Sequence, residues 1–320
     1  MKNFSLLICE DKETWNNFVR CSSTNNIFSE TNFLDLLSIT YKLYFIMHNE
    51  NPILGCIIID RANLDENPAY SRQMYHGLVI PKPKKISMNA FALLINDATI
   101  FLLEKITNLY DELVFCQHLA TNDTRAFQWF AYDSYPKHYI YHELLHTAAI
   151  DIGNYPSFEE YFQTLSKTRK SEYRTPKKSN LNLKINYSVD DFIQIFKHTF
   201  AVQDLVLDAS YIHEVHTVVS GIIANKSGSL EALYDQNDEI VSAAVFIGDG
   251  ISSYYLHGAT DRNKKQNGNM TFLILNHIRN CFKNGVCNLN LMGVNSPNRG
   301  YFKTSFGADV KQFHEIIIRK

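Results

Sequence analysis

This sequence of 320 residues lacks three features that would assign it to a specialised class of protein. Its six cysteines are scattered and include no CxxC pair, so they indicate reduced core residues and not a disulfide framework. No apolar run approaches the roughly 18 residues that a membrane helix needs, and the first apolar run is too short for a signal peptide. The formal net charge is only −2, so no overall field draws the protein to nucleic acid or membrane. These absences predict a cytoplasmic protein without a membrane span, in which only local basic clusters could bind phosphate.

What the sequence does contain is an alternation of helical and strand patterns. The expected elements are a hairpin over 42–61, a helix over 91–106, aromatic strands over 113–116 and 126–145, a helix over 156–174 ended by Pro176, a hairpin over 229–249 and a last strand over 310–320. Because the chain exceeds what one core usually fills, we expect two domains packed together, residues 1–150 and 151–320. The predicted fold class is α/β, with mixed sheets of the α+β type and helices on their faces.

The most informative segment runs from residue 252 to 307. In it a strand leads into a basic, glycine-containing loop, and the loop opens a helix. Backbone amides at the start of such a helix, with basic side chains beside them, could hold a pyrophosphate. The same order of strand, basic loop and helix occurs earlier, with the triplets YHG at 75–77 and LHG at 256–258 in corresponding places. A duplicated nucleotide-handling unit is the simplest explanation.

Four segments together resemble the Fem family of peptidyl and aminoacyl transferases and the related tandem GNAT-like N-acyltransferases. They are TNDTRAFQWFAYDSYPKHYIYHELL, LSKTRKSEYR, SSYYLHGATD and GYFKTSFGADV, in that order between residues 121 and 310. The resemblance implies two GNAT-like acyltransferase domains, the second of which carries the donor site. The sequence leaves no room for the long helical hairpin of the staphylococcal bridge-building members.

The resemblance also implies a reaction. Such enzymes transfer an acyl or aminoacyl group to an amine from acyl-CoA or aminoacyl-tRNA, without a tightly bound cofactor, and both donors stay open here. The implied acceptor is a small-molecule or lipid-linked amine of cell-envelope synthesis, such as an amino sugar nucleotide or a muropeptide precursor. It would lie in the cleft between the domains.

The segment from Lys265 to Met270 is a degenerate form of the R/Q-x-x-G-x-G/A loop that grips the pyrophosphate of coenzyme A. Lysine replaces the usual arginine or glutamine, and methionine replaces the small last residue. A surface turn between a strand and a helix would explain the same residues. The residues expected to bind the donor are Arg262, Lys264, Lys265, Gln266, Gly268 and Asn269.

The expected catalytic residues are Lys303, His257 and Asp261. In the resemblance, the lysine of Phe302-Lys303 lies at the reaction centre, where its ammonium can stabilise the oxyanion of the tetrahedral intermediate. The alternative is a solvated lysine on an edge strand. His257 and Asp261 flank the end of the central strand and could take a proton from the attacking amine, although a core histidine would fit position 257 as well.

The run of cations from Lys167 to Lys178 is the densest basic patch. By resemblance it borders the cleft, where it could bind an acceptor diphosphate or tRNA. It could equally be a solvated helix face, or the binding surface of a non-catalytic relative that holds a nucleotide or RNA. The residues expected to bind substrate are Arg169, Lys170, Tyr173, Tyr255, Asn295, Arg299 and Phe302. The residues around Arg299 also fit a simple tight turn.

A zinc hydrolase is the alternative enzyme. Residues 142–146 spell H-E-x-x-H, which binds zinc only on a helix, where His142 and His146 share a face. The aromatic residues before it favour a strand, and the third ligand would have to be Glu159 or Glu160, closer than such enzymes usually place it. We therefore expect no metal site.

Overall fold

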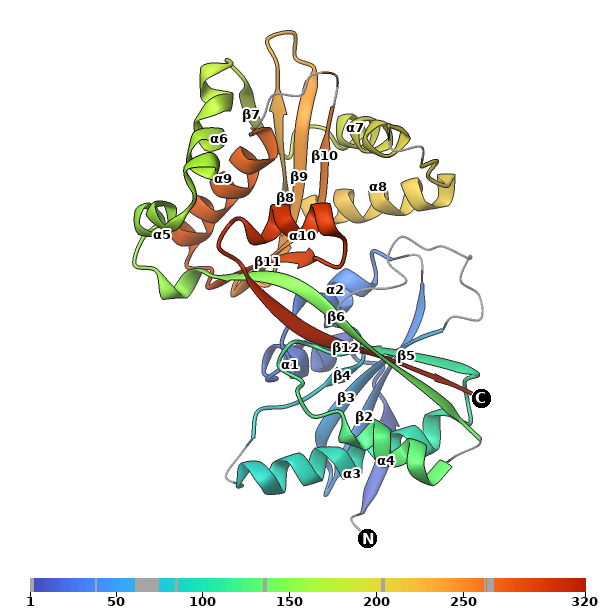
Figure 1. The fold of residues 1–320 in the computed structure, drawn as a ribbon. Coiled ribbons are helices and arrows are strands. Elements are labelled where there is room, and N and C mark those ends of the chain that lie inside the picture. The colour runs from blue at the N-terminus through green and yellow to red at the C-terminus, as the bar shows by residue number, and fades with distance from the viewer. Residues whose placement is uncertain are drawn as a thin grey trace. The chain divides into compact units, whose positions relative to one another are not determined.

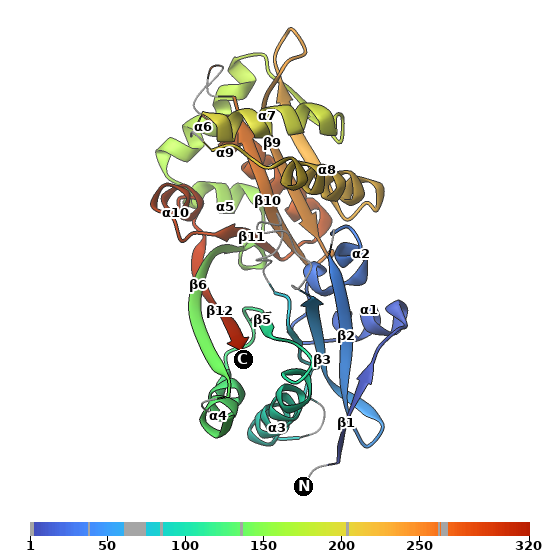
Figure 2. The ribbon, with the colours of Figure 1, turned by 90° about the vertical axis from the view of Figure 1, so that its right-hand side faces the viewer.

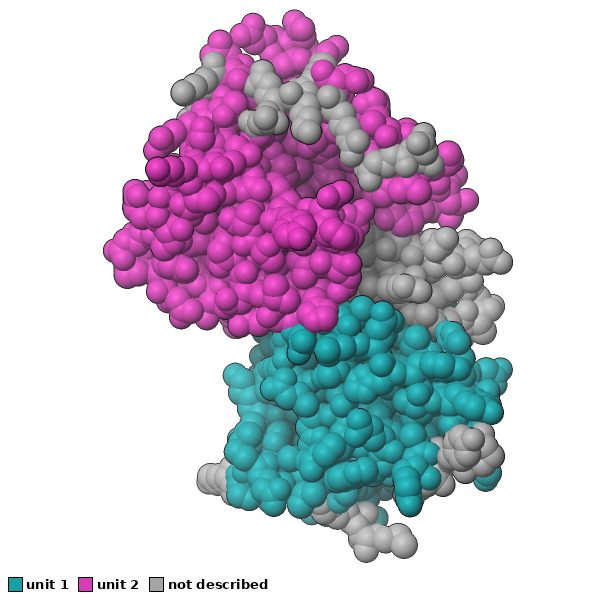
Figure 3. Space-filling view, viewed as in Figure 1, with its two compact units in different colours: residues 1–145, 312–320 teal, residues 146–311 magenta. Residues whose placement is uncertain are grey.

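The computed structural model describes residues 3–37, 39–60, 75–83, 86–134, 137–202, 205–261, 263 and 268–320. It divides into two compact units, coloured separately in Figure 3: unit 1 comprises residues 1–145 and 312–320, and unit 2 comprises residues 146–311. The last strand, β12 (Asp309–Arg319), pairs antiparallel with β5 (Glu112–Cys116), and this pairing explains why residues 312–320 belong to unit 1.

Unit 1 contains a four-stranded antiparallel sheet in the order β1-β2-β3-β4. These strands are β1 (Phe4–Ile8), β2 (Thr40–His48), β3 (Asn51–Asp60) and β4 (Leu78–Val79), and the helices are α1 (Lys12–Arg20), η1 (Ile27–Ser29), α2 (Thr31–Leu34), α3 (Met88–Ile106) and α4 (Arg125–Ser134). The hairpin predicted over 42–61 is confirmed as β2–β3, and Asn49 and Glu50 make its turn with positive φ. Leu54, Leu102 and Phe115 are fully buried in the core between these strands and α3.

The segment from residue 125 to 134 is the helix α4, where the aromatic residues predicted a strand. That prediction was wrong because Phe127 and Phe130, three positions apart, are both buried, whereas Trp129 and Tyr132 are exposed. This is helical spacing, and packing of α4 against α3 overrides the strand preference of aromatic side chains.

Unit 2 contains a mixed sheet in the order β6-β11-β10-β9-β8-β7, in which β10 and β11 are parallel and the other pairs are antiparallel. The strands are β6 (Tyr139–Asp151, of which residues 146–151 belong to unit 2), β7 (Asn182–Ile185), β8 (Gly228–Tyr234), β9 (Ile240–Gly248), β10 (Ser252–Thr260) and β11 (Asn288–Gly293). The helices are η2 (Ile152–Asn154), α5 (Phe158–Thr164), α6 (Lys167–Lys178), α7 (Val189–Ala201), α8 (Ala209–Ala224), α9 (Asn269–Asn284) and α10 (Pro297–Thr304). Figures 1 and 2 show α6 and α9 on one side of β8–β10, and α7 and α8 on the other. The predicted α/β class is confirmed.

Helix α9 supplies much of the unit 2 core, where Phe272, Leu275 and Ile278 pack with Phe246 of β9. The single helix predicted over 156–174 is two helices, because the Ser166 hydroxyl accepts from the Arg169 amide and so caps a new start. Among the helices of the described ranges, none combines the length and the apolar character needed to cross a bilayer.

Candidate functional site

The parallel strands β10 and β11 part in the middle of unit 2. They pair only over residues 252–254 of β10 and 288–290 of β11. β10 stays paired with β9 as far as Thr260, with an irregularity between Tyr255 and His257. Beyond residue 254, therefore, the carboxyl ends of the two parallel strands separate. In sheets of this kind, ligands bind outside the carboxyl ends of the strands, where neighbours diverge.

Asn290 explains how β11 leaves its neighbour. Its buried Oδ1 accepts from Thr147 Oγ1 at 2.5 Å and from the Met292 amide at 2.8 Å. Met292 has a left-handed backbone with φ of 64°, and the pairing of β11 with β6 is irregular over the same residues. An asparagine side chain that bonds the backbone two residues on produces such a local turn.

Helix α10 brings Lys303 to the separated strands. Lys303 Nζ donates to the Gly293 carbonyl at the end of β11 (3.0 Å), and it lies 5.7 Å from the centre of the Tyr255 ring on β10. One ammonium therefore contacts both diverging strands. The alternatives of an edge-strand lysine and of a simple tight turn around Arg299 were wrong, because residues 297–304 form a helix and Lys303 is partly buried.

The surroundings of Lys303 lower the pKa of its ammonium group. Burial, and after it the positive charge of Arg299, lower the pKa of Lys303 to about 8. An ammonium has three N–H groups, and the Gly293 carbonyl takes one of them. The other two N–H groups can donate hydrogen bonds to an oxygen atom that becomes negatively charged during a reaction.

Tyr255 and Gly258 form the β10 side of this site. The Tyr255 hydroxyl donates to Met270 Sδ, at the start of α9, over 3.3 Å. Burial raises the pKa of Tyr255, so the phenol stays protonated at neutral pH. A Cβ at position 258 would overlap the Tyr255 Oη, so only glycine lets the hydroxyl occupy this place.

Among the described residues, the start of α9 contains polar groups that have no hydrogen-bond partner. Its N-cap is Gly268, with φ of 109°, and within the described structure no side chain caps the first N–H groups. Asn269 is 1% exposed, and neither its Oδ1 nor its Nδ2 has a hydrogen-bond partner there. A buried amide left unpaired costs about 1–3 kcal/mol. A bound phosphate would accept from such donors. The other predicted donor residues, Arg262, Lys264, Lys265 and Gln266, lie outside the described residues.

Arg169 joins the start of α9 to α10 from inside unit 2. Its Nε donates to Ser305 Oγ at 2.7 Å, and its Nη1 donates to Thr271 Oγ1 at 2.8 Å and to the Glu172 carboxylate. The guanidinium carbon lies 4.7 Å from the centre of the Phe302 ring. The predicted substrate-binding residues Arg169 and Phe302 are therefore both engaged in packing that holds α10 in place.

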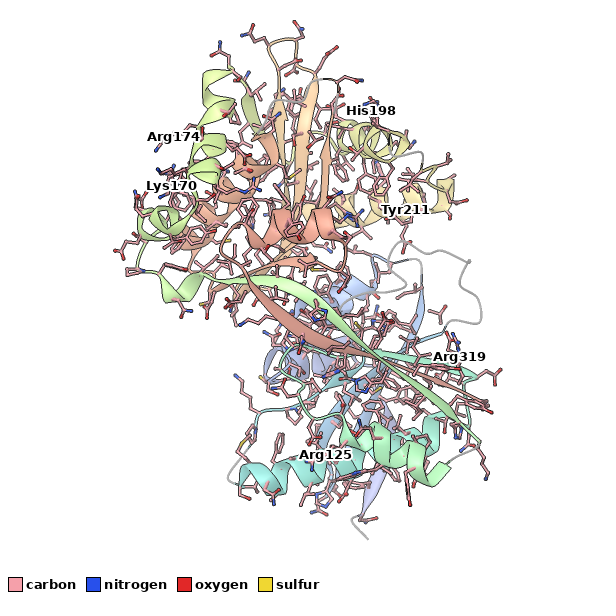
Figure 4. The ribbon with its side chains drawn as sticks, viewed as in Figure 1. Arg125, Lys170, Arg174, His198, Tyr211 and Arg319 are labelled. Atoms are coloured by element: carbon pink, nitrogen blue, oxygen red, sulfur yellow. The ribbon has the colours of Figure 1, made fainter. Side chains whose placement is uncertain are left out.

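His257 and Asp261 lie beside α7, on the other side of the sheet from α9. The His257 ring packs 5.4 Å from the Phe196 ring, and burial lowers the pKa of His257 to about 4. Asp261 Oδ1 lies 3.3 Å from Nε2 of His198, which is labelled on α7 in Figure 4. The structure does not bring these two residues to Lys303 as a compact group, and their role in proton removal stays a prediction.

Sequence comparison finds no match, either to a protein-family model or to a curated protein. Solved structures, however, share the fold. FemX matches with a TM-score of 0.69 at 10% identity, covering 97% of this chain and 96% of that one. A tandem GNAT protein from the clavulanic acid biosynthesis pathway gives 0.56 at 8% identity, covering 99% and 98%. The chain has the Fem-type, tandem GNAT-like fold. L-PGS from Bacillus licheniformis gives 0.54 at 11% identity, covering 96% and 91%.

Within this Fem-type fold, the remaining residues of the basic run divide between core and surface. Tyr173 is 7% exposed and stacks on Phe272 with ring centres 5.5 Å apart, so it is a core residue. Lys170 and Arg174 lie on the outer side of α6 (Figure 4), where Lys170 Nζ donates to the Gln163 carbonyl at 2.7 Å. The side chains of residues 177 and 178 lie outside the described part of the chain.

Asn295 and Arg299 occupy different places at the start of α10. Asn295 Oδ1 accepts from the His146 amide of β6 at 3.1 Å, which fixes the connection between β11 and α10. Arg299 is exposed, and its charge acts on Lys303. Of the two, Arg299 is therefore better placed to reach an anionic substrate.

Three polar partners of Arg169 were not predicted: Glu172, Thr271 and Ser305. One local signal was available, because Arg169 stands four residues before Tyr173 and seven before Pro176, which are both buried. Helical spacing thus places Arg169 on the buried face of α6. Its partners on α9 and after α10 are distant in sequence, so no pattern indicated them.

The zinc-hydrolase alternative was wrong. Residues 142–146 lie in strand β6, and at about 3.3 Å per residue His142 and His146 are roughly 13 Å apart, too far to bind one metal ion. His142 Nε2 instead lies 2.8 Å from Nδ1 of His314 on β12. Glu159 and Glu160 belong to the first turn of α5.

Proposed function

We propose that the protein is an N-acyltransferase that moves an acyl group from acyl-CoA or aminoacyl-tRNA to an amine of a cell-envelope precursor. The observation that carries this proposal is the position of Lys303 Nζ, which donates to Gly293 of β11 and lies over the Tyr255 ring of β10, where the two parallel strands have separated. The Fem-type, tandem GNAT-like fold supports the same class of reaction.

Lys303 acts in this proposal on the charge that develops during transfer. The acceptor amine attacks the acyl carbon, a C–N bond forms, and the carbonyl oxygen becomes negative. The N–H groups of Lys303 that do not bind the Gly293 carbonyl donate to this oxyanion. These hydrogen bonds are stronger than neutral ones because the donor is charged. As the bond to the leaving group breaks, the protonated Tyr255 hydroxyl supplies a proton to the departing sulfur or oxygen, and the proton that the acceptor amine loses restores the phenol.

The start of α9 binds the phosphate of the donor in this proposal. Its first N–H groups, which no described side chain caps, carry the positive end of the helix dipole, and the buried Asn269 amide adds a donor that lacks a partner within the described structure. Coenzyme A and the 3′ end of tRNA both carry such phosphates, so α9 supports either donor.

The activity is expected to have an alkaline limit near pH 8. The oxyanion needs the protonated form of Lys303, whose pKa is lowered to about 8, so this contribution is complete at pH 6 and is lost as the pH rises through 8. Arginine at the same position stays charged throughout. With glucosamine as a model amine and acetyl-CoA as donor, the ratio of wild-type to Lys303→Arg turnover should fall about 100-fold between pH 7 and pH 10, because the protonated fraction of one group falls about tenfold for each of the two pH units above its pKa. A flat ratio would show that Lys303 does not titrate in this range.

The donor assignment is tested by calorimetry with acetyl-CoA and, separately, with charged tRNA. Wild-type protein should bind one of them, and Asn269→Leu should weaken that binding about 10- to 100-fold, the effect of removing one hydrogen bond to a charged group. The same variant should unfold at an equal or higher temperature, because leucine leaves no unpaired amide buried.

Asn284→Leu is the matched control, since Asn284 is exposed at the other end of α9 and should leave donor binding unchanged. Absence of heat with either donor would remove the donor assignment. Unchanged binding by Asn269→Leu would instead place the phosphate away from α9.

A further inference from the structure

A serine, a histidine and a glutamate form a hydrogen-bonded line at the middle of α9, eight residues after Asn269. Ser253 lies at the start of β10, His277 in α9 and Glu231 in β8. Ser253 Oγ is 2.9 Å from His277 Nε2, and His277 Nδ1 is 2.7 Å from Glu231 Oε1. These separations are those of a nucleophile, a base and an acid that orients the base. The acyl-transfer mechanism uses none of the three groups.

The surroundings fix the order of protons along this line. Glu231 is 1% exposed, and its Oε2 accepts from Asn276 Nδ2 at 3.0 Å. The His277 ring stacks on Phe246 with 3.6 Å between ring centres and 2° between planes, so it has little freedom to turn. An ionised carboxylate only accepts hydrogen bonds, so His277 Nδ1 carries the proton that faces it. His277 Nε2 is then free to accept the proton of the Ser253 hydroxyl.

A cavity of about 290 Å³ adjoins Ser253 and His277. Its wall includes Gly248 and Asn280. A Cβ at Gly248 would lie 2.7 Å from the Ser252 carbonyl, so a side chain at 248 would push the backbone of the wall aside. Asn280 stands three residues after His277 on α9, hence on the same face of the helix, and its side-chain NH2 group can donate to an oxyanion.

The cysteine in this cavity wall is not the nucleophile. Cys281 is 2% exposed, and burial raises the pKa of its thiol to about 12, so thiolate is scarce at neutral pH. Ser253 has a second acceptor, the Ile247 carbonyl, at 3.4 Å. The contact with His277 Nε2 is shorter by half an ångström, and it directs the hydroxyl proton toward the base.

We propose that Ser253, His277 and Glu231 form a second active site that hydrolyses esters of short acyl groups. Ser253 Oγ attacks the ester carbonyl while its proton passes to His277 Nε2. The alcohol then leaves with that proton as the C–O bond breaks, and the acyl group stays on Ser253. A water molecule attacks this acyl-serine, gives a proton to His277, and releases the acid as the serine regains its proton. The sum is ester plus water giving acid plus alcohol.

The size of the cavity defines the substrate class. A volume of about 290 Å³ admits an acetyl or similarly short acyl ester and not a long-chain lipid. His277 and Asn269 are eight residues apart on α9, which corresponds to about 12 Å along the helix axis, and Ser253 precedes Tyr255 by two residues on β10. The two sites are therefore neighbours that use different groups, and this proposal does not rest on the acyl-transfer site.

The decisive experiment is labelling of the folded protein with diisopropyl fluorophosphate, followed by mass spectrometry of the peptide that contains Ser253. We expect a phosphoryl adduct on Ser253, and hydrolysis of p-nitrophenyl acetate that falls at least 100-fold in Ser253→Ala and in His277→Gln. Lys303→Ala should keep both the adduct and this hydrolysis, which distinguishes the two sites.

If Ser253 stayed unlabelled in wild-type protein, and circular dichroism showed that this protein is folded, the proposal would be overturned. This result can be interpreted without any variant. Hydrolysis that is equal in wild type and Ser253→Ala would overturn it as well. The three residues would then be a buried polar network that joins α9 to the sheet.

Discussion

Replacing Lys303 by alanine is expected to lower the kcat of acetyl transfer to glucosamine by a factor of about 100 or more, which is the effect of removing one oxyanion donor. Lys303 Nζ donates to the Gly293 carbonyl and is fixed beside the Tyr255 ring before any substrate binds. Such a donor acts on charge that exists only in the transition state. The loss should therefore appear in kcat, with little change in the affinity for acetyl-CoA measured by calorimetry.

Two further variants make this result interpretable. Lys303→Met keeps most of the side-chain volume and lacks the ammonium, so it should match the alanine variant in turnover and stay close to wild type in melting temperature. Lys311→Ala removes an exposed lysine of β12 that lies 3.4 Å from Asp309, and it should leave turnover unchanged. If Lys303→Ala retained turnover within a factor of about three, the ammonium would have no share in oxyanion stabilisation, since one donor is worth far more than that.

The strand and helix patterns predicted the class of fold because they depend on local periodicity. The hairpins β2–β3 and β8–β9 have apolar strands around short polar turns, and both are where the sequence places them. Helix α4 was mistaken for a strand, because its aromatic side chains favour strands and only their burial shows the helical spacing.

The site was less accessible to sequence reasoning than the fold. The position of Lys303 was indicated by the family resemblance, whereas its partial burial depends on where α10 packs. The separation of β10 from β11 depends on the side chain of Asn290 and the left-handed backbone of Met292, which no periodicity encodes. Ser253, His277 and Glu231 come from three separate elements, so their contact exists only in the folded chain.

Replacing Arg169 by alanine is expected to lower the free energy of unfolding by about 3 kcal/mol, the lower end of the cost of removing one partner from a buried ion pair. The Arg169 and Glu172 side chains are 14% and 23% exposed, so the carboxylate left behind is largely desolvated. Ser305 and Thr271 each lose a hydrogen bond as well. Denaturant unfolding followed by circular dichroism measures the change.

A matched control and further substitutions identify the cause of the stability loss expected in Arg169→Ala. Arg174→Ala removes an exposed cation from the same helix and should change stability by less than about 0.5 kcal/mol. Adding Glu172→Gln to Arg169→Ala should recover part of the loss, because the neutral amide no longer leaves a charge unpaired. Arg169→Lys should not recover it, since one ammonium cannot reproduce the separate donors that reach Ser305 and Thr271.

Without Arg169, α10 loses its link to α9, so acetyl transfer should fall even at temperatures where the variant stays folded. Equal stability of Arg169→Ala and wild type would mean that this buried network does not position Lys303.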